Sequence, residues 1–302
     1  MHRLSCGGVP VAGNRSFNEE TMCRSSVDHW RVQRVTWSPF PGKLECVSSR
    51  THSPPTTYRR SEAIIFRRTR EDWGVLSNMA GGLPLCVPLR DGRTCEARTA
   101  EALYQACRFP EYPNIQAEIL EQASPMRAKW ISRHYREFTR PDWDCIRLQV
   151  MRWCLRLKLV QHPEIFGELL LRTGNLPIVE ESHRDDFWGA RPNGDVLIGM
   201  NMLGRLLTEL RDGLRKSLQT QRCHNLQIPP PRINRFLLLG SEVCAFLPGE
   251  AWSTWCNQIT AKLADTNSHD ATSEVTFPIP RQRVACQLDL PIFEISEPSN
   301  GE

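Results

Sequence analysis

The sequence lacks a long hydrophobic run. A membrane-spanning helix needs roughly 20 consecutive apolar residues, whereas the segment Phe236–Leu239, among the longest apolar runs here, has only four. The first residues also lack the apolar stretch of a secretory signal. We therefore expect a cytoplasmic protein that does not engage a membrane.

Paired metal-binding motifs are absent as well, although the chain has 12 cysteines. No two cysteines form a Cys-x-x-Cys pair and no His-x-x-x-His pair accompanies them, which argues against a structural zinc site. Cys107, Cys145 and Cys154 fall within helical patterns, so we predict reduced thiols in a core. Because no carboxylate cluster suited to magnesium stands out either, we expect neither a metal nor a cofactor.

Neither sign of charge dominates, since 38 Lys and Arg against 34 Asp and Glu give a net charge of +4. Residues 1–60 alone contribute nine basic and four acidic side chains, so the remainder sums to −1. A protein that coats duplex DNA usually has a larger positive excess on its folded part. Residues 125–158, however, hold nine basic against three acidic side chains. This local excess suits a few phosphates, and a solvated helix face explains it equally well.

Regular apolar patterning is confined to the middle of the chain. Residues 1–60 are rich in Ser, Arg and Pro, so we predict a mostly disordered extension there. One domain is predicted over residues 61–216. A proline-rich linker (217–232), a small appended element (233–263) and a disordered tail (264–302) are predicted to follow.

Helical periodicity outweighs strand patterning within the domain. Short strands are predicted at residues 63–66, 178–179 and 196–198, and an Asp91-Gly92 turn predicts a hairpin of residues 85–89 with 94–97. Helices are predicted after Thr99, from Ile115 through a restart at Ser124-Pro125, after Asp142, after Pro163 and from about Asn201. The predicted fold class is α+β, a helix-dominated single domain with a minor β-sheet, flanked by extensions.

Polar residues with possible chemistry gather in three segments. Glu101, Tyr104 and Gln105 share one helical edge, where Glu101 could be an acid or base or could merely complement the helix dipole, the interpretation we favour from the residues alone. Lys158 lies on an apolar helix side, so it either reaches out to solvent, which we favour, or is held inside with a lowered pKa. Residues 183–189 crowd acids, aromatics and glycine into a connection, which is typical of a binding loop.

The same segments, in the same order, resemble the NADAR (YbiA-like) family. Two departures are Ala102, where many members have histidine, and Ala190, where a glycine is usual. The matching motifs span roughly residues 66–214 and are Leu76-Ser77-Asn78-Met79, Glu101-x-x-Tyr104-Gln105-Ala106, Arg108-Phe109, Met151 with Lys158, Thr173-Gly174, Val179-Glu180, Asp185-x-x-Trp188-Gly189, Gly199-x-Asn201-x-Leu203-Gly204 and Leu210-Arg211.

The resemblance implies an N-glycosidic hydrolase. The residues at 77–80, 101–104 and 107–110 are similar to those of NADAR antitoxins, whose partner is a DarT-type toxin that attaches ADP-ribose to guanine in DNA. This similarity implies ADP-ribosylated DNA as substrate and a DarT-type toxin as partner. Other members hydrolyse ribosylamino intermediates of riboflavin synthesis, and a non-catalytic module that binds ADP-ribose or a toxin is a third reading. The sequence leaves these alternatives open.

The resemblance also implies which residues form the site. Glu101 or Asp185 would orient water or stabilise the sugar cation, Lys158 would assist the leaving nitrogen or hold substrate oxygens, and Trp188 would stack on ribose or base. By the local charge argument, Lys129 and some of Arg127, Arg133 and Arg67 are candidates for a pyrophosphate. The full set is Glu101, Lys158, Asp185 and Trp188 as catalytic residues, with Ser77, Asn78, Tyr104, Gln105, Lys129, Gly189, Gly199 and Asn201 as substrate-binding residues.

Overall fold

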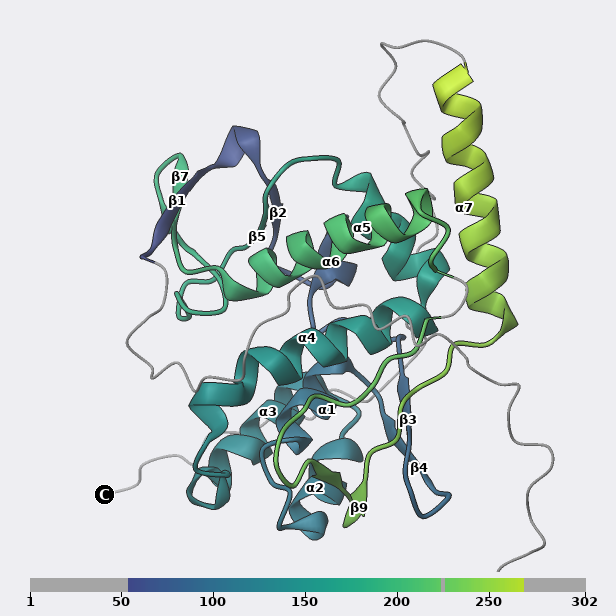
Figure 1. The fold of residues 1–302 in the computed structure, drawn as a ribbon. Helices are drawn as coiled ribbons and strands as arrows, with labels where there is room; N and C mark the ends of the chain where they lie inside the picture. Colours follow the sequence, from purple (N-terminus) through teal and green to yellow (C-terminus); the bar gives the residue numbers. More distant parts are fainter. Residues whose placement is uncertain (1–53, 224–225, 269–302) are drawn as a thin grey trace, which may run out of the picture. The chain divides into compact units, whose positions relative to one another are not determined.

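The structure is a computed structural model that describes residues 54–223 and 226–268. The extension predicted over residues 1–53 and the tail from residue 269 lie outside the described residues. The predicted α+β class, with helices dominant, is confirmed (Figure 1). The helices are α1 (Ala100–Ala106), α2 (Pro113–Leu120), α3 (Pro125–His134), α4 (Trp143–Gln161), α5 (Glu168–Arg172), α6 (Met202–Gln219) and α7 (Glu250–Ser268), with short turns η1 (Arg60–Glu62), η2 (Gly74–Leu76), η3 (Arg136–Phe138) and η4 (Pro163–Gly167).

The strands are short and form four small sheets. They are β1 (Thr56–Arg59), β2 (Ile64–Phe66), β3 (Leu85–Pro88), β4 (Thr94–Ala97), β5 (Ile178–Glu180), β6 (Arg191–Asn193), β7 (Val196–Gly199), β8 (Leu237–Leu238) and β9 (Ser241–Glu242). β1, β7 and β6 form an antiparallel sheet, β2 pairs with β5 in parallel, and β3–β4 is the predicted hairpin. β8 and β9 form a second hairpin.

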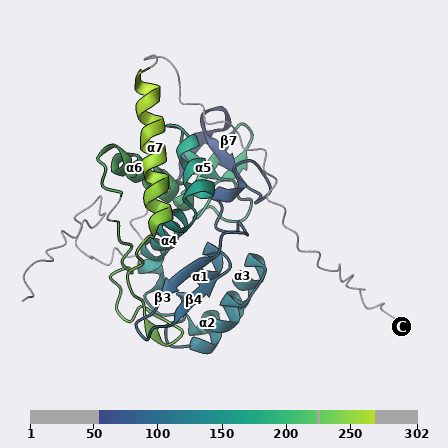
Figure 2. The same cartoon turned by 90° about the vertical axis from the view of Figure 1, so that its right-hand side faces the viewer.

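Helix α4 is the centre of the described fold. It packs against α1, α6 and η4, while α1, α2 and α3 pack on one another and α6 covers β5. Figures 1 and 2 both show α1–α3 and the β3–β4 hairpin on one side of α4, with α5 and α6 on the other. Ile146, Val150, Cys154 and Leu157, spaced three or four residues apart on one face of this helix, are buried.

Local capping explains where two helices of the site begin. The Thr99 hydroxyl accepts the N–H of Ala102 at 3.1 Å, and the Ser124 hydroxyl accepts that of Arg127 at 3.4 Å. Such bonds satisfy backbone donors that a helix start leaves unpaired. Both caps match the sequence prediction, and they fix the starts of α1 and α3, which both line the site.

The N-terminal boundary differs from the predicted one. Thr56–Arg59 were assigned to the extension, but they form β1 and pair with Val196–Gly199. Thr56 and Tyr58 of this strand are half-buried, and the Tyr58 side chain packs against the small cluster of Val179, Ala190 and Leu197. The folded unit therefore includes residues before Ser61.

Residues 226–263 also differ from the predicted linker and appended element. Ile228 is buried and pairs with Phe246, and the Gln116 side chain donates to Leu237 O at 2.9 Å and accepts from Leu239 N at 2.6 Å. Phe236, Leu238, Val243, Trp252, Trp255, Cys256 and Ile259 belong to the same core cluster as α1 and α4. This segment is thus a part of the main core. No helix within residues 54–223 or 226–268 is both long and apolar enough to cross a membrane.

We predict that Trp255→Ala lowers the free energy of unfolding by about 3–5 kcal/mol, the usual cost of truncating a buried large aromatic side chain. Trp255 is 2% exposed and its ring packs over Gly167. Urea denaturation measures the change, with Leu247→Ala, at a position 64% exposed, as the control. A Trp255→Ala protein as stable as the control would mean that α7 is not integral to the core.

Candidate active site

One cavity of about 300 Å³ opens between α1, α3, the start of α4 and the loop after β5. That volume is at the lower end of the range for small-molecule sites, roughly 300–1,000 Å³. Its lining is mostly polar and aromatic: Ser77, Asn78, Met79, Glu101, Tyr104, Gln105, Arg108, Lys129, Arg133, Trp143, Asp144, Arg147, Met151, Glu180, Ser182, Asp185, Trp188 and Leu203.

Glu101 is held on the predicted polar edge of α1. Gln105 Nε2 donates to Glu101 Oε1 at 2.8 Å, and Ser132 Oγ and Arg108 donate to Gln105 Oε1 at 2.6 and 3.2 Å. The Glu101 residue is only 5% exposed. No donor among the described residues is hydrogen-bonded to its Oε2. One carboxylate oxygen is therefore fixed by the protein, and the other is free for a substrate or water.

Glu180 is a second carboxylate in this cavity that sequence analysis did not select. It ends β5, and the face that it occupies is opposite to that of Glu181, as strand alternation requires. Its carboxylate makes no hydrogen bond or ion pair with another described residue. Burial, with the nearby charges of Glu101 and Asp185, raises the pKa of Glu180 to about 7, against a smaller opposing effect of Lys129. Near neutral pH this group is divided between its acid and base forms.

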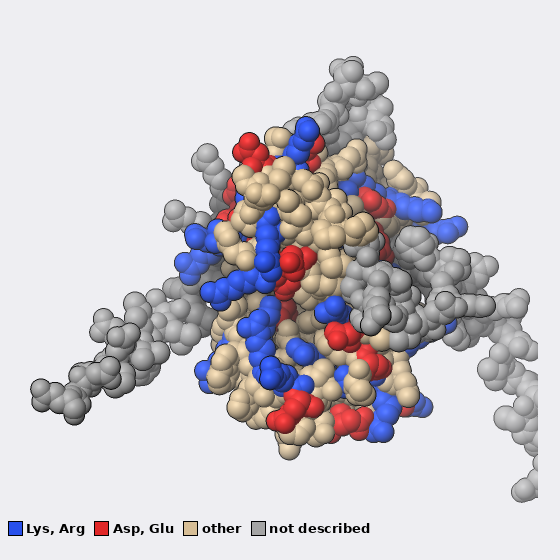
Figure 3. Space-filling view, turned by 90° about the vertical axis from the view of Figure 1, so that its left-hand side faces the viewer, with Lys and Arg blue, Asp and Glu red and all other residues tan. Residues whose placement is uncertain are grey.

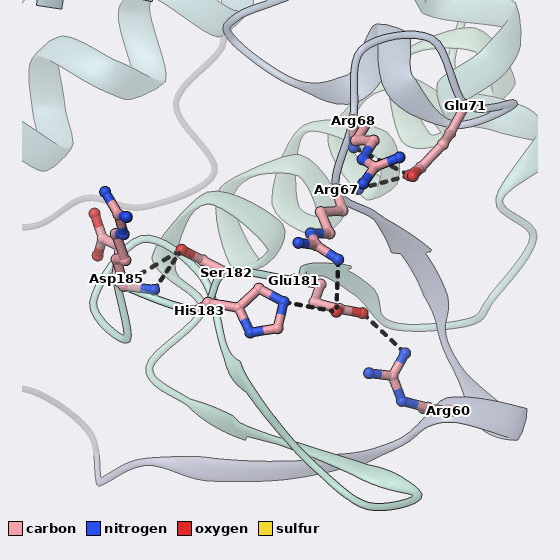
Figure 4. A network of polar contacts seen from close by, with 9 residues as sticks. Arg60, Arg67, Arg68, Glu71, Glu181, Ser182, His183 and Asp185 are labelled. Atoms are coloured by element: carbon pink, nitrogen blue, oxygen red, sulfur yellow. Dashed lines mark hydrogen bonds and ion pairs between the residues drawn. The ribbon is translucent and has the colours of Figure 1, made fainter.

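Asp185 differs from the two glutamates, because its carboxylate is hydrogen-bonded within its own loop. Its Oδ1 accepts the N–H groups of Phe187 and Trp188 at 3.1 and 2.9 Å, and its N–H donates to Ser182 Oγ at 3.1 Å. The Ser182–Asp185 contact is visible in Figure 4. Asp185 thus shapes the turn that presents Trp188 to the cavity, in addition to lining the cavity itself.

The outer side of the same loop is tied to the β1–β2 region. Figure 4 shows Glu181 between Arg60, Arg67 and His183, at 2.8, 3.9 and 3.8 Å. Arg60 and Arg67 are partly exposed, so these pairs are weak individually. Together they hold the loop from the side opposite to the cavity. Arg67, a candidate for pyrophosphate binding, is therefore placed on Glu181 and outside the cavity lining.

Aromatic rings form one wall. The Tyr104 ring lies 5.0 Å from Trp143 and 5.6 Å from Trp188, the latter edge to face. The Arg147 guanidinium lies 3.7 Å from the Phe187 ring centroid, and that of Arg108 lies 5.4 Å from Trp143. The edge-to-face contact with Tyr104 holds the Trp188 ring at the cavity lining.

Four cations also line the cavity, two of them beside the aromatic rings. Arg108, Lys129, Arg133 and Arg147 all line the cavity, and of these only Arg147 has an ion pair among the described residues, 3.5 Å to Asp144. Lys129 is half-buried and Arg133 is exposed. Unpaired cations beside a cavity are suited to an anionic group such as a phosphate. Arg127, another phosphate candidate, lies outside the lining, on a different face of α3 from Lys129 and Arg133.

Ser77 and Asn78 reach the cavity from the end of η2. The Asn78 Oδ1 atom is buried and has no hydrogen-bond partner within the described parts of the chain. The Ser77 hydroxyl accepts the N–H of Met79 at 3.1 Å. A buried acceptor without a donor costs free energy unless a ligand or water supplies one. Asn78 is accordingly suited to accept a hydrogen bond from a substrate.

Lys158 does not reach the cavity. Its Nζ donates to the carbonyls of Val75 and Ser77 at 2.6 and 2.9 Å and lies 4.4 Å from the Phe166 ring centroid. The side chain is fully buried, so the expectation that it reaches out to solvent is wrong; burial lowers the pKa of Lys158 to about 7. Its contacts are those of a positioning residue that holds the Ser77–Asn78 segment against α4.

Gly189, Gly199 and Asn201 also lie behind the cavity. A Cβ at Gly189 would lie 2.6 Å from Glu180 O, and one at Gly199 would lie 2.5 Å from Gly189 O. Asn201 Oδ1 accepts the N–H of Glu180 at 3.1 Å and its Nδ2 donates to Ile178 O at 2.8 Å. These three residues allow close backbone packing under the site and fix Glu180 from below.

The structure therefore divides the predicted site residues into two groups. Glu101, Asp185, Trp188, Ser77, Asn78, Tyr104, Gln105 and Lys129 line one cavity, whereas Lys158, Gly189, Gly199 and Asn201 support it. Sequence analysis missed Glu180, Trp143 and Arg147. The Val179-Glu180 motif was a signal for the first. In the described part of the chain no group of three or more His, Cys, Asp or Glu is placed to hold a metal ion.

The fold and site together define a helix-dominated α+β protein whose cavity combines carboxylates, indole rings and cations. This set of groups is suited to a charged sugar derivative. The chain belongs to the NADAR domain family, whose model matches residues 65–215, half of the chain.

The relatives include proteins of known name. The chain is 38% identical over 151 residues to the N-glycosidase YbiA of Shigella boydii and of Escherichia coli K12. The aligned residues cover 50% of this chain and 88% of each relative. It is 33% identical over 155 residues to a riboflavin biosynthesis protein of Vibrio vulnificus, 51% of this chain and 39% of that protein. The NMR structure of E. coli YbiA matches with a TM-score of 0.44 and 31% identity, over 60% of this chain and 98% of that chain.

We predict that Lys158→Met lowers the free energy of unfolding by about 1–3 kcal/mol, because the Val75 and Ser77 carbonyls lose their donor in a buried place. Chemical denaturation measures the change. Lys216→Met, at an exposed position of α6, is the matched control and should change stability by less than about 0.5 kcal/mol. Equal stability of the two variants would show that these carbonyls do not depend on Lys158.

Proposed function

We propose that this chain is an N-glycosyl hydrolase that removes ADP-ribose from guanine bases of DNA, as the antitoxin to a DarT-type DNA ADP-ribosyltransferase. The observation that carries the proposal is the pairing of unbonded carboxylate oxygens, on Glu101 and Glu180, with unpaired cations in one cavity. The names of the relatives, N-glycosidases, support the reaction type.

The carboxylates match the demands of this reaction. Cleavage of an N-glycosidic bond builds positive charge on the ribose, and the departing nitrogen must gain a proton. Glu101, fixed through Oε1 by Gln105, is suited to stabilise the sugar cation or orient the attacking water through Oε2. Glu180 is suited to donate the proton, because burial keeps a fraction of it protonated near pH 7. Asp185 is committed to two backbone donors and is assigned to shaping the loop.

The remaining lining is suited to the rest of the substrate. Trp188 and Trp143 offer ring faces and edges to ribose or base, and Asn78 Oδ1 offers an acceptor. Lys129 and Arg133, at the outer end of the cavity wall on α3, are suited to a pyrophosphate. The cavity of about 300 Å³ is small for the whole ADP-ribose unit, so we assign the cavity to the ribosyl-base bond and the rim to the remaining nucleotide.

A second candidate is hydrolysis of ribosylamino intermediates of riboflavin synthesis. The Vibrio vulnificus relative, a riboflavin biosynthesis protein, favours it. A small monophosphate would need fewer cations than this cavity wall provides. Incubating the protein with guanine-ADP-ribosylated DNA and, in parallel, with a ribosylamino pyrimidine phosphate separates the two. Release of free ADP-ribose supports the first candidate. Turnover of the pyrimidine alone overturns it, and turnover of neither supports a binding module.

Glu101→Gln should lower kcat by roughly 100-fold or more, the scale for losing a positioned acid or base group, while the melting temperature stays near that of the wild type. The amide keeps the shape and can still accept from Gln105. Glu96→Gln, an exposed position on β4, is the matched control and should leave both quantities unchanged. Near wild-type turnover by a folded Glu101→Gln protein would remove Glu101 from the mechanism.

The pH profile tests Glu180. If its carboxyl donates the proton, kcat/KM is high below about pH 7 and falls above it, because the acid form is lost there. Glu180→Gln should lower kcat/KM by roughly 100-fold and remove the fall near pH 7. Asp186→Asn, an exposed carboxylate of the same loop, should keep the wild-type profile. An unchanged profile in Glu180→Gln would show that Glu180 is not the proton donor.

A further inference from the structure

Helix α3 exposes a row of planar side chains next to the cavity. The Arg127 guanidinium lies 4.8 Å from the Trp130 ring centroid, and the His134 ring stacks on Trp130 at 6.0 Å and an angle of 14°. Trp130 is 56% exposed and neighbouring Met126 is 66% exposed, the two most exposed large apolar side chains of this helix. Arg127, Trp130 and His134 are here called the α3 ladder.

The ladder adjoins the cavity at Trp130. Successive residues of a helix are turned by about 100°, so Trp130 lies about 60° around α3 from Arg133, which lines the cavity wall. Arg127 and His134 lie farther round the helix from Lys129 and Arg133. A ligand that fills the cavity and extends outward past Arg133 therefore meets Trp130 first.

The electrostatic character of this surface has one sign. Residues 125–136 contain Arg127, Lys129, Arg133, Arg136 and His134 and no Asp or Glu. Within the described residues, Arg127, Lys129 and Arg133 make no ion pair. On the face seen in Figure 3, Lys and Arg side chains run in a column down the surface, with Asp and Glu side chains beside them.

We propose that the α3 ladder binds the unpaired nucleotides of a single-stranded DNA segment that flank the modified base in the cavity. The inference rests on the proposed function and adds that the substrate is recognised as a polymer strand. Unpaired bases stack on exposed aromatic rings while cations follow the phosphates, a combination that is typical of single-strand binding surfaces. A base stacks on Trp130 by displacing the Arg127 guanidinium, which is then free to pair with a phosphate.

The chemistry of the ladder favours unpaired DNA over two other polyanions. A duplex keeps its bases stacked on each other, so no base would stack on Trp130. An acidic peptide would pair with the cations and likewise leave the ring and Met126 uncovered. Only a strand with exposed base faces uses both the charge and the aromatic surface.

Binding of an unmodified single-stranded oligonucleotide, followed by fluorescence anisotropy, tests the ladder without any turnover. Trp130→Ala should weaken binding about 10-fold, the scale of one lost base stack, and Trp130→Phe should weaken it less. Leu247→Ala, which removes a side chain 64% exposed outside α3 and the cavity, is the matched control and should bind as the wild type does. Arg127→Ala should reduce the slope of log K against log salt by about 0.7, the value for one phosphate contact on a single strand.

Three outcomes of the binding experiment overturn the inference. They are wild-type affinity in Trp130→Ala, equal affinity of the wild type for duplex and single strand, and an equal affinity for poly-glutamate. Each would mean that the ring faces of α3 do not recognise bases.

Turnover separates this inference from the proposed function. With guanine-ADP-ribosylated oligonucleotide, Trp130→Ala should raise KM about 10-fold at near wild-type kcat, and with free ADP-ribosylated guanosine the change in KM should be far smaller. An equal change for both substrates overturns the ladder as a strand-binding surface. If the wild type turns over neither substrate, the proposed function fails, and the oligonucleotide binding experiment still decides the inference.

Discussion

The connection between the end of β5 and the start of α6 fixes the geometry on which the rest of the site depends. Asn201 adopts a left-handed conformation with φ of 49°, and its amide bonds to the backbone on both sides of Val179. A side chain of this length and with both a donor and an acceptor is needed there. Once the register of β5 is fixed, strand alternation alone sends Glu180 into the cavity and Glu181 to the outer surface.

Some polar residues of the site hold its shape, whereas neighbouring carboxylate oxygens are left free to contact a substrate. Asp185, Ser182 and Glu181 make the bonds that shape and hold the loop, and Gln105 and Ser132 hold Glu101 through one oxygen. Glu180 and the second oxygen of Glu101 are thereby left unbonded in a preformed site. Lys158 supports the opposite side of the cavity. Its buried Nζ donates to two carbonyls, those of Val75 and Ser77, and so holds the η2 segment in place.

Sequence analysis predicted the parts of this arrangement that local geometry decides. The helix starts at Thr99 and Ser124, the β3–β4 hairpin and the helix after Asp142 follow from spacings of a few residues. The polar edge with Glu101 follows from helix periodicity. The orientation of the Glu180 side chain could not be predicted from the sequence, because a strand of three residues pairs equally well with either face inward. The surroundings of Lys158 and the strand Thr56–Arg59 depend on partners far along the chain, which periodicity does not report.

The segment of residues 226–259 closes the core against elements that lie much earlier in the chain. Leu239 bonds to Gln116, Val243 pairs with Leu89 and Trp255 covers Gly167. Contacts of such long sequence separation form late, because the intervening chain must first be ordered. During synthesis, α1 to α6 must leave the ribosome before their last core residues are available. The cavity-forming helices therefore pass through a stage with exposed apolar surface, in which they are open to chaperones and proteases.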